Sequence, residues 1–285
     1  MFKNWMMKLL VLTVFLTPIV YADDCSSQFY NGQAPQLSAQ LQSRTTFLCF
    51  EQYALTYSGV TRSPLWTAEY LTNNRVKEAR RLKRQDSFHE EDRLPVSDRN
   101  TLKDFKGIGR LSIDRGHMSP NSDFSTYSAQ FESFSLANII AQDSNNNQIL
   151  WEGIESATRT LATQHEKLFV VTGPIFDQRD HLLNGRIMIP TRIFKAIYDP
   201  NRKEAAAYIV QNAPGMDYEV VSIHDLERQI GINVFPGITE SIKMKAARLP
   251  EPTPHNDKGG RSHSRHAANN DMSAVVERGL KAIFR

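Results

Sequence analysis

The tetrapeptide Asp114-Arg115-Gly116-His117 is the sharpest motif in the sequence and the one from which a chemistry can be predicted. It follows the short segment Leu111-Ser112-Ile113, which we expect to form a strand. A histidine at a strand end can present one ring nitrogen to water, and its neutral form is available near pH 7 for general base catalysis. Arg115 is a permanent cation suited to a phosphate oxygen, and Gly116 lets another group come close. A structural histidine beside an Asp–Arg ion pair is the alternative interpretation.

Further along the chain, a helix is predicted from Asn145 to Leu161. Its apolar residues fall roughly on one face: Ile149, Leu150, Ile154, Ala157 and Leu161. A second stripe beside that face has i, i+4 spacing: Asn147, Trp151, Glu155 and Arg159. An asparagine oxygen is a hard ligand of the kind that Mg²⁺ accepts, and Glu155 can accept hydrogen bonds from waters around such a metal. A polar helix flank with an Asn-rich start is the alternative interpretation.

Together these segments resemble the DNA/RNA non-specific endonuclease family, which includes mitochondrial endonuclease G and secreted bacterial nucleases. The tetrapeptide 114–117 matches the family signature, and residues 136–142 resemble its Leu-Ser-Asn-x-x-Pro-Gln segment, with Ala137 and Ala141 in place of Ser and Pro. Asn147 falls where the family places its metal-binding Asn, and Asn146 is the neighbouring candidate. Further matching landmarks, within about residues 50–240, are Arg62 with Trp66, Arg84 with Phe88, Thr172-Gly173-Pro174, Ile189-Pro190-Thr191, Phe194-Lys195 and Phe235-Pro236.

The resemblance implies an α+β fold with a ββα-metal finger nuclease core on a central, mainly antiparallel sheet. A hairpin would present His117, and the crossing helix would present Asn147. The implied reaction is hydrolysis of DNA and RNA phosphodiester bonds with one Mg²⁺ or Mn²⁺ ion and a histidine base. The implied catalytic residues are His117, Arg115, Glu155 and Arg84, the metal ligand is Asn147, and the substrate-binding or supporting residues are Asp114, Asn138, Arg159 and Arg62.

The N-terminal residues 1–22 have the pattern of a signal peptide, with Lys3 and Lys8 before the apolar run Leu9–Val20. That run is shorter than the roughly 20 residues of an ordinary transmembrane helix. We therefore expect cleavage, no membrane anchor afterwards, and an exported protein that is periplasmic or secreted. An uncleaved anchor is the alternative.

Two cysteines, Cys25 and Cys49, follow the leader. In an exported protein two thiols most often pair, so a disulfide bond is expected, and two buried thiols are the alternative.

The whole chain has 34 basic and 31 acidic residues, and the leader contributes Lys3 and Lys8. The mature charge is therefore near +1, which excludes a global positive field as the means of binding nucleic acid.

The endonuclease domain is expected to span residues 23–248, followed by a polar, Pro-rich linker and a C-terminal helix in 249–285. Residues 243–266 are rich in basic residues and form either a basic arm for polyanions or a plain linker. Within the domain we expect strands at 53–59, 65–71, 167–173, 187–198 and 205–210, a helix at 222–230, and a long surface excursion at 73–106.

DNA and RNA are the expected partners, and a homodimer or an inhibitor protein is possible. The rival functions are an inactive nucleic-acid-binding module and a nuclease toxin or effector.

Overall fold

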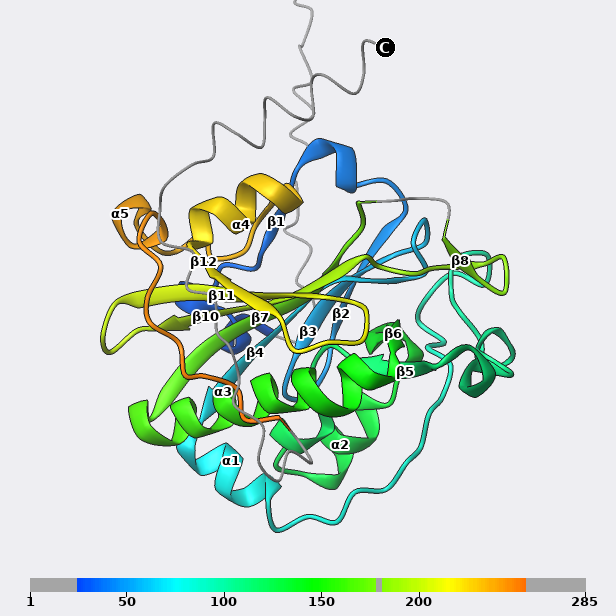
Figure 1. The fold of residues 1–285 in the computed structure, drawn as a ribbon, viewed down its shortest axis with the longest axis horizontal. Helices are drawn as coiled ribbons and strands as arrows, with labels where there is room; N and C mark the ends of the chain where they lie inside the picture. Colours follow the sequence, from blue (N-terminus) through cyan, green and yellow to red (C-terminus); the bar gives the residue numbers. More distant parts are fainter. Residues whose placement is uncertain (1–24, 178–180, 255–285) are drawn as a thin grey trace, which may run out of the picture.

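A seven-stranded sheet forms the centre of the computed structural model, which describes residues 25–177 and 181–254 (Figure 1). The strand order is β12-β11-β10-β7-β4-β3-β2, and every neighbouring pair is antiparallel. The predicted α+β class with a mainly antiparallel central sheet is therefore confirmed. The strands are β2 (Thr45–Cys49), β3 (Ala54–Ser58), β4 (Ser63–Thr72), β7 (Lys167–Ile175), β10 (Arg192–Asp199), β11 (Glu204–Gln211) and β12 (Tyr218–Val221).

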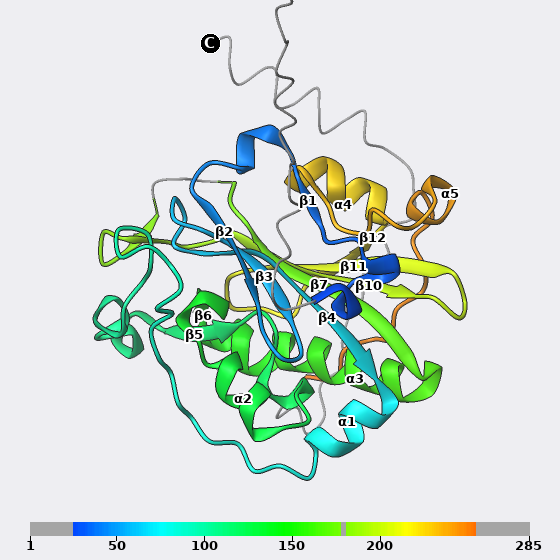
Figure 2. The same cartoon turned by 180° about the vertical axis from the view of Figure 1, so that it is seen from behind.

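The sheet is covered on both faces, which explains the nearly unbroken apolar runs of its central strands. On one face lie α1 (Asn73–Ala79), α2 (Tyr127–Ser133) and α3 (Glu152–His165). On the other lie α4 (Ile223–Ile230), α5 (Glu240–Lys243) and the small pair β1 (Gln36–Leu37) and β13 (Ile232–Asn233), as the two opposite views show (Figures 1 and 2). One core packs between the sheet and α3, and a second packs between the sheet and α4.

The ββα element lies on the α3 side of the sheet. Its two strands, β5 (Ile113–His117) and β6 (Ile139–Asp143), pair in antiparallel fashion, and a π-helical segment (Asn146–Trp151) leads from β6 into α3. The predicted order of a strand pair carrying His117 and a following helix carrying Asn147 is therefore confirmed. The expected strand at 111–113 is wrong, because Leu111 lies in a 3-10 turn (Ile108–Leu111) and the signature tetrapeptide itself is the strand.

Three other local predictions need correction. The excursion from residue 73 begins with α1, because the Thr72 side chain caps its first turn and Val76 is buried. The strand expected to end at Gly173 continues as β7 through Pro174 to Ile175, where it pairs with β10. The neighbouring strand β4 pairs with β7 only as far as Thr172, so the missing N–H of Pro174 interrupts no hydrogen bond to β4. The expected strand at 187–198 is broken around Pro190 into β9 (Ile187–Met188), which pairs with β8 (Leu182–Leu183), and β10.

The ends of the described chain are tied to the core. Cys25 and Cys49 form the expected disulfide, with their Cα atoms 5.8 Å apart. Leu249 is buried, and Pro250 accepts a hydrogen bond from the Tyr208 hydroxyl, so the chain still packs on the core beyond Arg248 instead of leaving as a linker there. The predicted leader 1–22 and C-terminal helix lie outside the described residues. Within those residues, no helix has the length and apolar character needed to cross a membrane.

Candidate active site

His117 ends β5 and is held between two aromatic rings. Its ring centroid lies 5.4 Å from that of Phe88 and 5.0 Å from that of Phe134, the latter in an edge-to-face contact. Nε2 is buried and has no hydrogen-bond partner in the described part of the chain, whereas Nδ1 is not among the fully buried atoms without a partner, and the residue as a whole is only partly buried. Nδ1 is therefore the nitrogen that can meet a water molecule.

Two guanidinium groups flank this aromatic cage. Arg115 lies 3.9 Å from the centroid of the Phe88 ring, and Arg84 lies 5.0 Å from that of Phe134. Burial, followed by the charges of Arg84 and Arg115, lowers the pKa of His117 to about 3, although Asp86 opposes the shift. The imidazole is therefore neutral at pH 7, the state that a general base requires.

Gly116 is required by the packing of the two strands. A Cβ at this position would lie 2.7 Å from the Cβ of Gln142, which belongs to the facing strand β6. The amide nitrogen of Gln142 donates a 2.9 Å hydrogen bond to Asn146 Oδ1. The glycine thus allows Gln142 to connect the strand pair with the start of the helix.

Asp114 orients Asn147. Its Oδ2 accepts hydrogen bonds from Asn147 Nδ2 at 2.9 Å and Gln148 Nε2 at 2.8 Å, and its Oδ1 accepts one from the Ser144 hydroxyl at 2.8 Å. Because the amide nitrogen of Asn147 is held in this way, its carbonyl oxygen faces away from Asp114. Burial raises the pKa of Asp114, but these hydrogen bonds and Arg115 outweigh it, so the pKa is below its usual value.

The structure separates Asn147 from Asn146, the neighbouring candidate ligand. Asn146 is buried, its Oδ1 accepts from Gln142, and its Nδ2 donates to the Gln211 carbonyl. Asn147 Oδ1 has no hydrogen bond within the described residues. Asn147 is thus the residue whose amide oxygen remains available to a cation.

The first turns of the predicted helix are π-helical, not α-helical. The side chain of Asn146 is bound to both β6 and β11, and we attribute the wider turn to these contacts. Of the predicted apolar face, Leu150, Ile154, Ala157 and Leu161 are buried, whereas Ile149 is only half-buried.

Glu155 and Arg159 lie side by side on α3. Arg159 pairs with the buried Asp123 at 3.1 Å, with Glu152 at 3.4 Å and with Glu155 at 4.0 Å. Burial raises the pKa of Glu155 to about 7, while the charges of Lys195 and Arg159 act in the opposite direction. Lys195 itself is buried on β10, bonded to the Thr172 hydroxyl at 2.8 Å.

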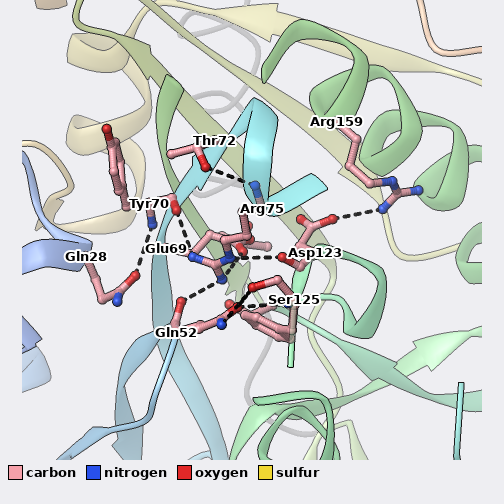
Figure 3. A network of polar contacts seen from close by, with 12 residues as sticks. Gln28, Gln52, Glu69, Tyr70, Thr72, Arg75, Asp123, Ser125 and Arg159 are labelled. Carbon is pink, nitrogen blue, oxygen red and sulfur yellow. Dashed lines mark hydrogen bonds and ion pairs between the residues drawn. The ribbon is translucent and has the colours of Figure 1, made fainter. Parts of the chain in front are cut away.

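A buried polar network supports this part of the site (Figure 3). Arg75 of α1 lies between Glu69, at 3.4 Å, and the Asp123 carbonyl, at 2.9 Å, and it also donates to the Gln52 carbonyl. Asp123 in turn binds Arg159, so the network runs from β4 to α3. Burial raises the pKa of Glu69. The network therefore couples the position of α3 to that of the sheet.

Two predicted supporting residues bind other parts of the protein. Asn138 is fully buried and bonds to the backbone of Ser119 and Ser133, where it holds the chain between β5 and β6. Arg62 donates to carbonyl groups of residues 97–99. The structure thus places Arg84 and Arg115 at the cage around His117 and binds Asp114 to Asn147, while Asn138 and Arg62 hold loops.

Sequence reasoning missed several contributors: Phe134 as the second wall of the cage, Gln148 as a partner of Asp114, and the Glu69–Asp123 network. Glu69 lies within the largely apolar run 65–71. Because an unpaired buried charge is costly, this glutamate was the available signal that a buried partner exists. No sequence signal connected Phe134 with His117, since the contact depends on how the chain returns along β6.

The comparisons with known proteins identify the family of this chain. The family model for DNA/RNA non-specific endonuclease matches residues 31–241, so the chain belongs to that family. Nuclease C1 of Cunninghamella echinulata var. echinulata is 30% identical over 66% of this chain and 82% of its own length. Human mitochondrial endonuclease G is 28% identical over 70% of this chain and 71% of its own.

One further relative and one solved structure are also similar to this chain. Mitochondrial nuclease EXOG of Danio rerio is 31% identical over 66% of this chain, which spans 60% of that relative. A chain of the solved EndoG/EndoGI complex superposes with a TM-score of 0.58 at 21% identity, covering 69% of this chain and 88% of its own. The latter likeness concerns the fold, and it agrees with the ββα-metal nuclease architecture.

The donors present suit a hydrated hard cation. The described residues contain no group of three or more His, Cys, Asp or Glu side chains that could hold a metal by themselves. They offer instead the carbonyl oxygen of Asn147, whose amide nitrogen donates a hydrogen bond to Asp114. Mg²⁺ keeps several waters and prefers oxygen ligands, so it fits this site better than a metal that needs several nitrogen or sulfur ligands.

Proposed function

We propose that the protein is an exported endonuclease that hydrolyses phosphodiester bonds in both DNA and RNA, with His117 as the general base. The observation that carries the proposal is a histidine enclosed by two rings on which two arginines stack, at the end of the strand whose Asp114 orients the amide of Asn147. A module that only binds nucleic acid would need the arginines but not a neutral base.

In the proposed reaction, Nδ1 of His117 accepts a proton from the attacking water. The lowered pKa keeps this nitrogen unprotonated at pH 7. Arg84 and Arg115 offer positive charge to the phosphate next to the ring, and their stacking on Phe134 and Phe88 fixes them there. Asp114 holds Asn147 with its oxygen available to one Mg²⁺ ion, which when bound would stabilise negative charge on the phosphate and leaving oxygen.

These contacts favour an enzyme that does not select the sugar. The charged groups of the site are suited to phosphate, which DNA and RNA share, whereas sequence and sugar are read through base edges and the 2′-hydroxyl. Products with 5′-phosphates are expected from the family resemblance.

Digestion of plasmid DNA and of RNA by the mature protein tests the proposal. Cleavage of both substrates with Mg²⁺, none with EDTA, and a strong loss in His117→Ala are the expected results. The same assay with Mn²⁺ compares the two candidate metals. Binding of both polymers without cleavage under any of these conditions would favour the inactive binding module.

Export is part of the proposal, and the leader pattern together with the Cys25–Cys49 disulfide supports it. N-terminal sequencing of the protein from its native host should begin at Asp23, in the periplasm or the medium. An intact Met1 would contradict cleavage. A homodimer and an inhibitor protein remain predictions, for which sedimentation and co-purification are the direct measurements.

A further inference from the structure

Helix α2 exposes two aromatic side chains beside the active site. Tyr127 and Phe131 lie one helical turn apart and are 54% and 52% exposed. In the described part of the chain, the only other comparably exposed aromatic is Phe47, on β2. Aromatic rings are costly to leave in water, so two on one helix face call for an explanation in terms of a ligand.

Phe131 is backed by His89 in a parallel stack. The two ring centroids are 4.4 Å apart, and the planes differ by 4°. His89 therefore covers one face of the Phe131 ring, while the residue as a whole remains 52% exposed. This arrangement offers one flat, rigid surface to a planar group.

The stacked rings of Phe131 and His89 are linked to the His117 cage through both of its aromatic walls. His89 follows Phe88 in sequence, and the Phe88 ring packs against His117. On the other side, Phe134 is the next turn after Phe131 and also packs against His117. The His89 backbone is bonded to Phe134 and Leu136, so the stack and the cage are parts of one rigid unit.

The approach to this surface carries the charge that a nucleic-acid strand needs. The chain entering from α1 exposes four cations before it reaches His89: Arg80, Arg81, Lys83 and Arg84. Glu78 and Asp86 pair with two of them, Arg81 and Arg84. A strand whose phosphate lies at Arg84 would have its neighbouring bases near Phe131.

We propose that Phe131, stacked on His89, is a platform for an unpaired base of the substrate strand. The inference deepens the proposed nuclease function and depends on it for the identity of the ligand. Bases in a duplex are already stacked and paired, so the platform acts on single-stranded DNA, RNA and unpaired ends. Every base has a π-face, and the contact is therefore independent of sequence.

Equilibrium binding in EDTA tests the platform without cleavage. The probes are a fluorescently labelled oligothymidylate and an abasic strand of the same length, which keeps the phosphates and lacks the bases. The wild type should bind the oligothymidylate about 5- to 150-fold more tightly, the range that corresponds to one aromatic–base stack. Phe131→Leu keeps apolar volume over His89 but has no π-face, so the preference should disappear.

Two further variants make the test specific. Phe131→Trp keeps an aromatic face and should retain the preference. Phe47→Leu is the matched control, because Phe47 is also an exposed aromatic but packs against Phe29 and Trp66, away from His117. This variant should also retain the preference for the oligothymidylate.

Several outcomes would overturn the platform: equal binding of both strands by the wild type, binding of neither, or an undiminished preference in Phe131→Leu. So would a gel-filtration shift from dimer to monomer in Phe131→Leu, because a second copy would then cover this face. Failure of the wild type to cleave with Mg²⁺ concerns the proposed function instead, and the binding comparison separates the two failures.

Discussion

Replacing Asp114 by alanine tests how the proposed metal site is oriented. The carboxylate accepts three hydrogen bonds, from Ser144, Asn147 and Gln148, and its Oδ2 is the partner that holds the Asn147 amide. Without it the amide can rotate, and its oxygen is no longer directed. We therefore expect the Mg²⁺ concentration needed for half-maximal cleavage to rise in Asp114→Ala.

The expected size follows from the role of Asp114 behind the ligand. Loss of such an orienting partner typically costs about 10- to 100-fold in metal affinity, or about 1.4–2.8 kcal/mol. The fold should also lose about 1–3 kcal/mol, since a charged acceptor and its hydrogen bonds are removed. The pKa of Asp114 is lowered in the folded state, so this stability contribution is complete at pH 7 and fades as the pH falls below about 4.

The assay is a Mg²⁺ titration of plasmid cleavage, with urea unfolding measured on the same samples at pH 7 and below pH 4. Glu227→Ala is the matched control. That carboxylate also accepts three hydrogen bonds, from Lys243 and the Val234 backbone, but it lies on α4 across the sheet. The control should lose stability and keep the wild-type Mg²⁺ dependence.

A folded Asp114→Ala protein with an unchanged Mg²⁺ midpoint would refute this reasoning. It would mean that the Asn147 amide is held by other contacts or takes no part in binding the metal. A midpoint shift of equal size in Glu227→Ala would also refute it, because the effect would then follow from lost stability alone.

Three further predictions concern the base, the strand pair and the disulfide. His117→Ala should lower kcat by about 10²–10⁴-fold or more on plasmid DNA, and near wild-type cleavage would remove His117 from its role. Since the pKa of His117 is about 3 in the folded protein, protonation of this ring should not limit activity above pH 5. The unfolded chain binds a proton at this histidine below about pH 6.5, so the free energy of unfolding should fall progressively below that pH. Urea unfolding of the wild type and His117→Ala at several pH values measures this effect. Gly116→Ala should lose both activity and thermal stability because its methyl group meets Gln142, and an unaltered melting temperature would contradict that contact. Replacing both Cys25 and Cys49 by serine should lower the free energy of unfolding by about 3 kcal/mol, and urea curves that coincide with those of the oxidised wild type would show that the disulfide adds nothing.

Much of the site could be predicted from the sequence because its parts are local. The signature tetrapeptide lies within one strand, and Asn147 and Glu155 lie on one continuous helical segment, so spacing is enough to relate them. The same holds for α4, where the Ser222 cap and an apolar period coincide. Periodicity could not reveal the π-helical turn at Asn146, since that turn depends on hydrogen bonds to β6 and β11.

The sequence by itself supplied the short motifs that name the residues of the site, because such motifs act over a few neighbouring positions, and the fold class followed from the resemblance of those motifs to a known family. Only the tertiary structure decided which asparagine keeps a usable oxygen, which nitrogen of His117 meets water, and which arginines stand beside it. Those properties depend on burial and on partners distant in the chain: Phe88 and Phe134 enclose the ring, and Asp114 reaches across to Asn147. Burial and hydrogen-bond partners are set when the strands and helices pack together, so they have no signature in any single segment.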